Sequence, residues 1–372
     1  MRLALLWLIG CNLRVSVLAL PPVLPLIHRD LQLSESGVAA IAGVPLLLFG
    51  LGALPGGLLI ARVGAQRAIL VGLPLVGVCA ALRGVGPSVT VLFAATAGLG
   101  TAIAITQPAI PTLAQHWFPQ RVPRATSTWA NGLLMGTVLS ASLSLPLILP
   151  LVGQSWQWTL VIWAIPAPLA ALLLGLEVRN SHGSVQSRRA SRWLPDWRDH
   201  RLWQVGLLQA AGTLCYFGAS TFIPDYLQAT GRSGLTAVAL AGLSLGQIPG
   251  SLLVGVARWS RIDRTSTALG LGAAVFLALC GLLIAPTFVF VAAATLLGAA
   301  CGATLVIALA LPPLLAKPSD VPRMASGALC IGYSLVWLTL LAAGTAWDFL
   351  HAPAVAFLPA AIGSALILAV GP

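Results

Sequence analysis

Long apolar runs alternate with short polar segments along the whole sequence. Most runs are close to the ~20 helical residues that cross ~30 Å of hydrocarbon, and many joints carry breaker residues, such as Gly86-Pro87. The runs are continuous rather than alternating, which disfavours a β-barrel. We therefore predict an all-α integral membrane protein. Its twelve transmembrane helices are expected at residues 3–27, 37–60, 67–83, 88–114, 124–150, 156–176, 202–226, 234–257, 265–284, 286–314, 323–346 and 351–370.

The longest polar stretch divides the predicted spans into six and six, and two motifs recur in equivalent places. PGGLL at 55–59, in the second span, resembles PGSLL at 249–253 in the eighth, and VPRATS at 122–127, entering the fifth, resembles VPRMAS at 321–326, entering the eleventh. Parallel repeats of this kind place a substrate between two bundles near the bilayer midplane. We predict two six-helix pseudo-repeat bundles: an N-terminal bundle at 1–176, a cytoplasmic linker at 177–201 and a C-terminal bundle at 202–372.

Composition agrees with this class, since 58% of the residues are hydrophobic and 8% are charged. The formal charge of +11 does not indicate a nucleic-acid partner, because the arginines lie in short loops between spans, where they act as an orientation signal. If both termini are cytoplasmic, the outer segments hold only Arg29, Arg83 and Arg232. The six cysteines lie inside apolar runs without metal-ligand spacing, so they indicate neither a disulfide framework nor a metal site. We expect no cofactor and no catalytic residues.

The first span carries an arginine, Arg14, close to its middle. A lone arginine there costs about 2.5–3.5 kcal/mol on insertion scales, so Arg14 is expected to face a protein interior or a water-filled cavity. The acidic residues lie at or beyond the predicted helix ends. Arg14 is therefore either a structural residue that binds carbonyls or a neighbouring carboxylate, or the residue that attracts the substrate, and we favour the second. Arg83, near the outer end of the third span, is expected to snorkel to the boundary.

Helical spacing gives further candidates for the substrate pathway. Polar residues of the seventh span share one face, the fourth span has a glutamine directly before a proline, and the eleventh has two aromatic residues on one face. Glutamine and asparagine side chains can equally join helices to one another, and the aromatic rings can simply pack. The candidates beside Arg14 are Gln107, Trp129, Asn131, Gln209, Tyr216, Gln247, Tyr333 and Trp337.

The loop between the second and third spans has a glycine, a basic residue, a second glycine and a second basic residue, at Gly57, Arg62, Gly64 and Arg67. This pattern and the six-plus-six layout resemble the major facilitator superfamily, in which the loop has a gating role. The sequence departs from the family pattern at Ala61, where the family usually has Asp. Short motifs also resemble the cyanate/2-nitroimidazole permeases: Asn12-Leu13-Arg14, Phe118-Pro119-Gln120-Arg121, Ser326-Gly327 and Gly332-Tyr333.

The resemblance implies a secondary transporter that moves a small anionic or nitro-type polar solute by alternating access, with Arg14 as the central charge. We also expect a monomeric, multi-pass protein of the bacterial cytoplasmic (inner) membrane with both termini cytoplasmic, whose partners are the solute and the lipid bilayer. The alternative is a multidrug-type exporter of neutral or apolar compounds, which would not depend on Arg14. An intramembrane enzyme would need a cluster of His, Asp, Glu or Ser near an interface, and the sequence has none that is evident.

Overall fold

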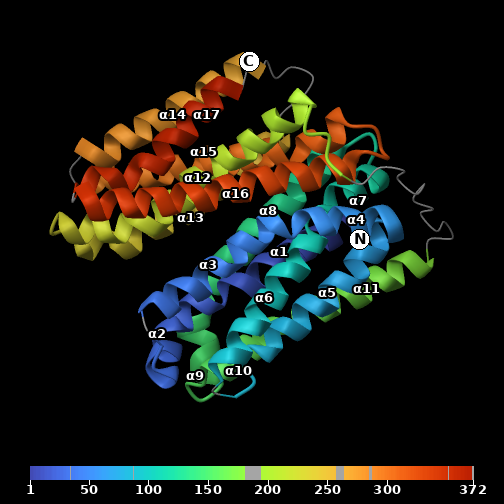
Figure 1. Cartoon of the computed structure of the whole chain (residues 1–372), viewed down its shortest axis with the longest axis horizontal. Helices are drawn as coiled ribbons and strands as arrows, with labels where there is room; N and C mark the ends of the chain where they lie inside the picture. The colour runs from blue at the N-terminus through green and yellow to red at the C-terminus, as the bar shows by residue number, and fades with distance from the viewer. Residues whose placement is uncertain are drawn as a thin grey trace. The chain divides into compact units, whose positions relative to one another are not determined.

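The structure, a computed structural model, describes residues 1–33, 35–86, 88–180, 194–256, 264–284, 287–350 and 352–370. Within these ranges all regular secondary structure is helical (Figure 1). Nine described segments are long and apolar enough to cross a membrane, or up to eleven if each of two bent helix pairs counts as one span. The helix α12 (His200–Ala229) lies outside that set but has 30 residues. The predicted all-α membrane fold is confirmed, and residues 181–193 of the predicted linker lie outside the described ranges.

The chain forms two compact units, which are described separately. Unit 1 consists of Met1–Asp196 and Ala316–Cys330. Its elements are α1 (Arg2–Leu18), α2 (Leu20–Leu31), α3 (Glu35–Leu51), α4 (Ala53–Val63), α5 (Ala65–Leu82), α6 (Val89–Thr106), α7 (Ala109–Trp117), α8 (Val122–Leu143), η1 (Ser144–Ile148), α9 (Leu149–Leu151), α10 (Trp156–Ala164), α11 (Pro166–Asn180) and the first part of α16 (Val321–Leu350).

Unit 2 consists of Trp197–Leu315 and Ile331–Pro372. Its elements are α12, η2 (Ser233–Leu235), α13 (Thr236–Val256), α14 (Arg264–Ile284), α15 (Thr287–Leu315), the rest of α16, η4 (Pro353–Phe357) and α17 (Leu358–Val370). The domain boundaries proposed from the sequence stay a prediction.

Several predicted spans are broken helices rather than single rods. The predicted span 37–60 bends by 48° between α3 and α4, at Gly52, and the predicted span 124–150 bends by 46° at the π-helical segment η1. Glycines and π-helical insertions are recognised causes of sharp kinks. The first span breaks at Ala19, two residues before Pro21 and Pro22, whose nitrogens cannot donate to the preceding turn.

Both units contain a helix pair that packs through small residues at the recurring motif. In unit 1, a Cβ added to Gly56 of α4 would lie 2.6 Å from the carbonyl oxygen of Ala104 in α6. In unit 2, a Cβ added to the equivalent Gly250 of α13 would lie still closer to the carbonyl oxygen of Ala299 in α15. Glycine lets two backbones come together in this way, which is how membrane helices pack in the absence of a hydrophobic driving force. The two motifs therefore have the same packing role in the two units.

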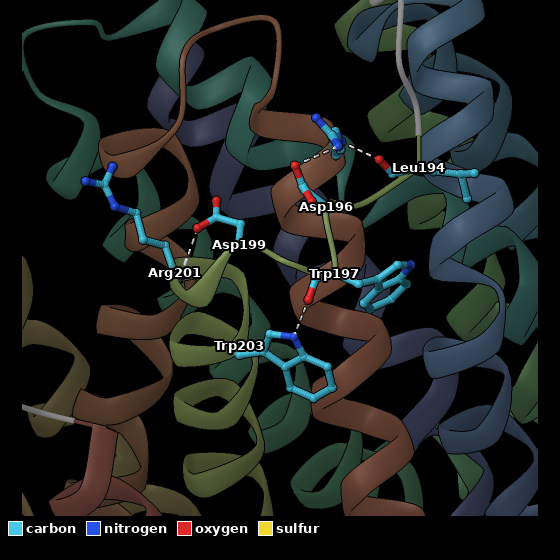
Figure 2. A network of polar contacts seen from close by, with 7 residues as sticks. Leu194, Asp196, Trp197, Asp199, Arg201 and Trp203 are labelled. Carbon is cyan, nitrogen blue, oxygen red and sulfur yellow. Dashed lines mark hydrogen bonds and ion pairs between the residues drawn. The ribbon is translucent and has the colours of Figure 1, made fainter.

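The end of the linker is fixed by polar contacts (Figure 2). Arg323 of α16 donates from Nε to the carbonyl of Leu194, and its guanidinium lies 3.6 Å from the carboxylate of Asp196. Asp199 is the N-cap of α12, where its carboxylate accepts from the backbone N–H of Arg201 at 2.9 Å. A side chain at this position satisfies one of the N–H groups that a helix start leaves open. The sequence Asp-His-Arg thus sets where α12 begins.

Candidate functional site

In unit 1, α1 packs along α8 (Figure 1). Arg14 belongs to α1 and lies at this contact. A Cβ added to Gly136 of α8 would overlap the carbonyl of Cys11 and lie 3.1 Å from the Cβ of Arg14. The side chain of Arg14 is half-buried and has a contact partner within the protein. Arg14 lies one turn before the end of α1 at Leu18 and near the middle of the candidate span Arg2–Leu24, and its role toward a solute stays a prediction.

Trp129 and Asn131 lie on the same contact between α1 and α8. Trp129 is fully buried against Gly10 of α1, and its indole Nε1 has no hydrogen-bond partner. Asn131 accepts a hydrogen bond from the indole Nε1 of Trp7 at 2.9 Å, so its amide oxygen joins the two helices. The structure thus gives Asn131 a helix-joining contact, while its role toward a solute stays a prediction.

Gln107 is the C-cap of α6, directly before Pro108 and the start of α7. Its side chain is buried and has a contact partner within the protein. A proline after the cap lacks the N–H that would continue the helix ladder, so the chain breaks here as the sequence indicated. Gln107 therefore lies at an irregular, buried joint of unit 1.

In unit 2, the candidates of the seventh and eighth spans lie on α12 and α13. Gln209 is buried and donates from Nε2 to the hydroxyl of Thr213 at 3.3 Å, one turn further along α12. The hydroxyl of Tyr216 lies 3.4 Å from the hydroxyl of Ser244, which links α12 to α13. Part of the polar face predicted for the seventh span is therefore used for hydrogen bonds within the protein, such as the one between Gln209 and Thr213.

The remaining candidates of unit 2 are on α13 and α16. Gln247 is buried on α13, and its backbone is closely approached by Gly302 of α15. Tyr333 is buried and has a contact partner within the protein, whereas Trp337, one turn later on α16, is half-buried. Gln209 packs through its Cγ against Gly332, the neighbour of Tyr333, so α12 and α16 bring these two candidates near one another.

The predicted gating loop is a tight turn between α4 and α5. Gly64 has φ of +87°, a backbone conformation in which side chains with a Cβ are strained, which explains the second glycine of the motif. Arg62 is exposed in the last turn of α4, where a positive charge interacts favourably with the helix dipole, and Arg67 is exposed in the first turns of α5. Gly57 lies against Ser326 of α16, with 2.6 Å between an added Cβ and the hydroxyl oxygen.

The prediction that Arg83 snorkels to the membrane boundary is wrong. Its side chain is 2% exposed, and a guanidinium N–H donates to the backbone carbonyl of Ser16 in α1. Arg83 points into unit 1 because α5 packs on α1. The hydropathy of a segment cannot show in which direction a residue at its end points. The polar residues Asn12 and Ser16, one turn apart on α1, were the available sign that this face of α1 meets a polar group.

The sequence profile of the Major Facilitator Superfamily matches residues 6–340. The chain belongs to that superfamily. It is 28% identical over 257 residues to the cyanate transport protein CynX of Escherichia coli K12, which covers 68% of this chain and 65% of CynX. It is 29% identical over 238 residues to the 2-nitroimidazole transporter of the same organism, covering 63% of this chain and 60% of the relative. These alignments span less than two thirds of either relative.

Solved structures of the superfamily share the fold at low sequence identity. The proton:xylose symporter XylE matches all of this chain and 94% of its own with a TM-score of 0.79 at 13% identity, which supports the fold alone. The predicted resemblance to the superfamily and to its cyanate/2-nitroimidazole branch is confirmed by the profile and the two relatives. The chain is a multi-pass membrane protein of a transporter family.

Proposed function

We propose that this protein is a secondary transporter that moves a small anionic or nitro-bearing polar solute by alternating access, with Arg14 as the residue that attracts it. The observation that carries the proposal is the position of Arg14, half-buried near the middle of the candidate membrane span Arg2–Leu24, in a chain similar to transporters of cyanate and of 2-nitroimidazole. Guanidinium suits such solutes because its planar fork of N–H donors matches the paired oxygens of carboxylate-like and nitro groups.

Two further groups support a solute role. Tyr216 and Gln209 in unit 2 offer neutral hydrogen-bond donors, and half-buried Trp337 offers a flat apolar surface. Neutral donors orient a ligand without adding a second charge, which is the usual composition of a small-molecule site. We propose that these residues contact the solute together with Gln107, Trp129, Asn131, Gln247 and Tyr333.

The cellular setting is proposed from charge. The concentration of arginine and lysine in alternate segments indicates that both termini are cytoplasmic in a bacterial inner membrane. Fusing a reporter that is active only on the outer side to the C-terminus tests this. The orientation is wrong if the fusion is active there.

Uptake into proteoliposomes tests the role of Arg14, with labelled cyanate and labelled 2-nitroimidazole as separate probes. A hydrogen bond to a charged group contributes about 1.5–3 kcal/mol, so Arg14→Met should lower uptake by roughly 10- to 100-fold, and Arg14→Lys should keep part of the activity. Arg29→Gln is the matched control, since Arg29 is 76% exposed on α2. Undiminished cyanate uptake by Arg14→Met would refute the proposal, and transport of neutral dyes alone would favour a multidrug exporter.

A further inference from the structure

Arg83 is a buried charge that the proposed function does not use. The residue is the C-cap of α5, and its side chain is 2% exposed within unit 1. A guanidinium stays protonated inside proteins and has five N–H donors. Burying such a group costs free energy unless its charge is neutralised and its donors are satisfied.

The contacts of Arg83 satisfy few of its N–H donors and do not neutralise its charge. One N–H donates to the carbonyl of Ser16, while Nε has no hydrogen-bond partner. A carbonyl accepts a hydrogen bond but brings no negative charge. The carboxylates of Asp30, Glu177 and Asp196 are paired with other arginines, and none of the ion pairs found among the described residues includes Arg83.

The side chain next to this carbonyl is also unsatisfied. Ser16 is 0% exposed, and its hydroxyl has no hydrogen-bond partner. Asn12, one turn earlier on the same face of α1, donates from Nδ2 to the carbonyl of Leu8 and leaves its amide oxygen open. Buried polar atoms without partners are rare in native structures, and several of them along one helix face indicate a missing water or ligand.

We propose that Arg83 and Ser16 form a second binding position for a small anion, inside unit 1 and against α1. The open groups are an N–H of a cation and a hydroxyl, both of which can donate, so the matching ligand is an acceptor with negative charge. The burial of both residues restricts it to an anion of a few atoms. This inference rests on the proposed function, because the anion belongs to the solute class assigned to Arg14.

Arg14 and the Arg83 position are on different sides of α1. Arg14 faces α8, whereas Asn12 and Ser16 are each two residues away and therefore about 200° around the helix. The anion at Arg83 is thus a separate occupant rather than a second contact to the ligand of Arg14.

Thermal unfolding of the purified full-length protein in detergent tests the proposal, with potassium cyanate as the probe and potassium gluconate at equal ionic strength as the reference. A ligand at about ten times its dissociation constant should raise the melting temperature of the wild type by roughly 1–3 °C. Arg83→Met should melt at or above the wild-type temperature in gluconate, because a buried charge has been replaced by an apolar group, and should lose at least half of the rise in cyanate.

If Arg83→Met does not fold, Ser16→Ala tests the proposed anion position instead. It keeps the carbonyl that Arg83 contacts and removes only a hydroxyl without a partner, so it should leave stability in gluconate unchanged and reduce the rise in cyanate. Ser140→Ala is its matched control, because Ser140 is equally buried but its hydroxyl already donates to the carbonyl of Thr137 at 3.0 Å. The control should keep the full rise.

The outcomes separate this inference from the proposed function. If Arg83→Met melts several degrees lower in gluconate and keeps the full cyanate rise, Arg83 is only a support for α1 and the inference is wrong. A full rise in Ser16→Ala contradicts it as well. If Arg14→Met alone abolishes the rise, the proposed function stands without the second position. No rise in the wild type with cyanate, nitrite or formate overturns both.

Discussion

Gly136 of α8 sets how closely α1 can lie beside it, and therefore where Arg14 is placed. A methyl group at Gly136 would overlap the carbonyl oxygen of Cys11 and lie 3.1 Å from the Cβ of Arg14. The first of these neighbours is backbone, which cannot rotate away as a long side chain can. We predict that Gly136→Ala pushes α1 and α8 apart at the level of Arg14.

The magnitude follows from two opposing terms. Alanine is favoured over glycine in a helix interior by about 1 kcal/mol, while inserting a methyl group into a packed contact costs about 1–3 kcal/mol. The backbone clash places this site near the upper end of that range. We therefore expect Gly136→Ala to be less stable than the wild type by about 1–2 kcal/mol, which corresponds to a melting temperature lower by roughly 1–3 °C.

Gly270→Ala is the matched control for this prediction. Gly270 lies inside α14, and an added Cβ there would meet no heavy atom within 4 Å. The control should melt at or slightly above the wild-type temperature, and it should keep any anion-induced rise. Thermal unfolding of both variants in detergent, with and without cyanate, provides the comparison. The packing argument fails if Gly136→Ala is as stable as Gly270→Ala.

Three more predictions concern single contacts. Gly64→Ala should lower stability by about 1–2 kcal/mol, because φ of +87° strains a residue with a Cβ, and denaturation in detergent measures the loss. A double-mutant cycle on Trp7→Phe and Asn131→Leu should give a coupling free energy of about 0.6–1.7 kcal/mol for their 2.9 Å hydrogen bond, and additive effects would rule the coupling out. Asp199→Ala should cost about 1 kcal/mol by removing the cap of α12, whereas Asp199→Asn should restore most of it.

The helical spans could be predicted from the apolar runs alone, because a membrane requires long stretches without charge. The predicted span 88–114 corresponds to α6 and α7, which together form the segment Val89–Trp117. The breaks were harder to place. The helix breaks at Gln107 and Ala19 fall inside long apolar segments, so the hydropathy pattern does not reveal them. Only the prolines that follow indicate a break.

The candidate site could be predicted by residue type but not by contact. The energetic cost of a charge in mid-membrane drew attention to Arg14, which is half-buried and has a partner within the protein, while its role toward a solute stays a prediction. The same reasoning failed for Arg83, because its position near a helix end fits both a side chain that reaches for water and one that turns inward. Packing of α5 on α1 decides between the two, and that packing depends on residues far apart in the sequence. Asn131 illustrates the converse, since only the structure shows that Trp7 is its donor.

The two arginines place positive charge beside α1, whose stability therefore depends on other contacts. Arg14 lies on the side of α1 that faces α8, and Arg83 reaches the other side at Ser16, so this one helix is next to positive charge on both faces. Buried charge destabilises a fold unless packing elsewhere offsets it. The close approach of α1 and α8 at Gly136, together with the hydrogen bond between Trp7 and Asn131, provides that packing. Weakening the contact between α1 and α8 should therefore lower stability and anion response together, whereas removing the charge at Arg83 should reduce the response without lowering stability.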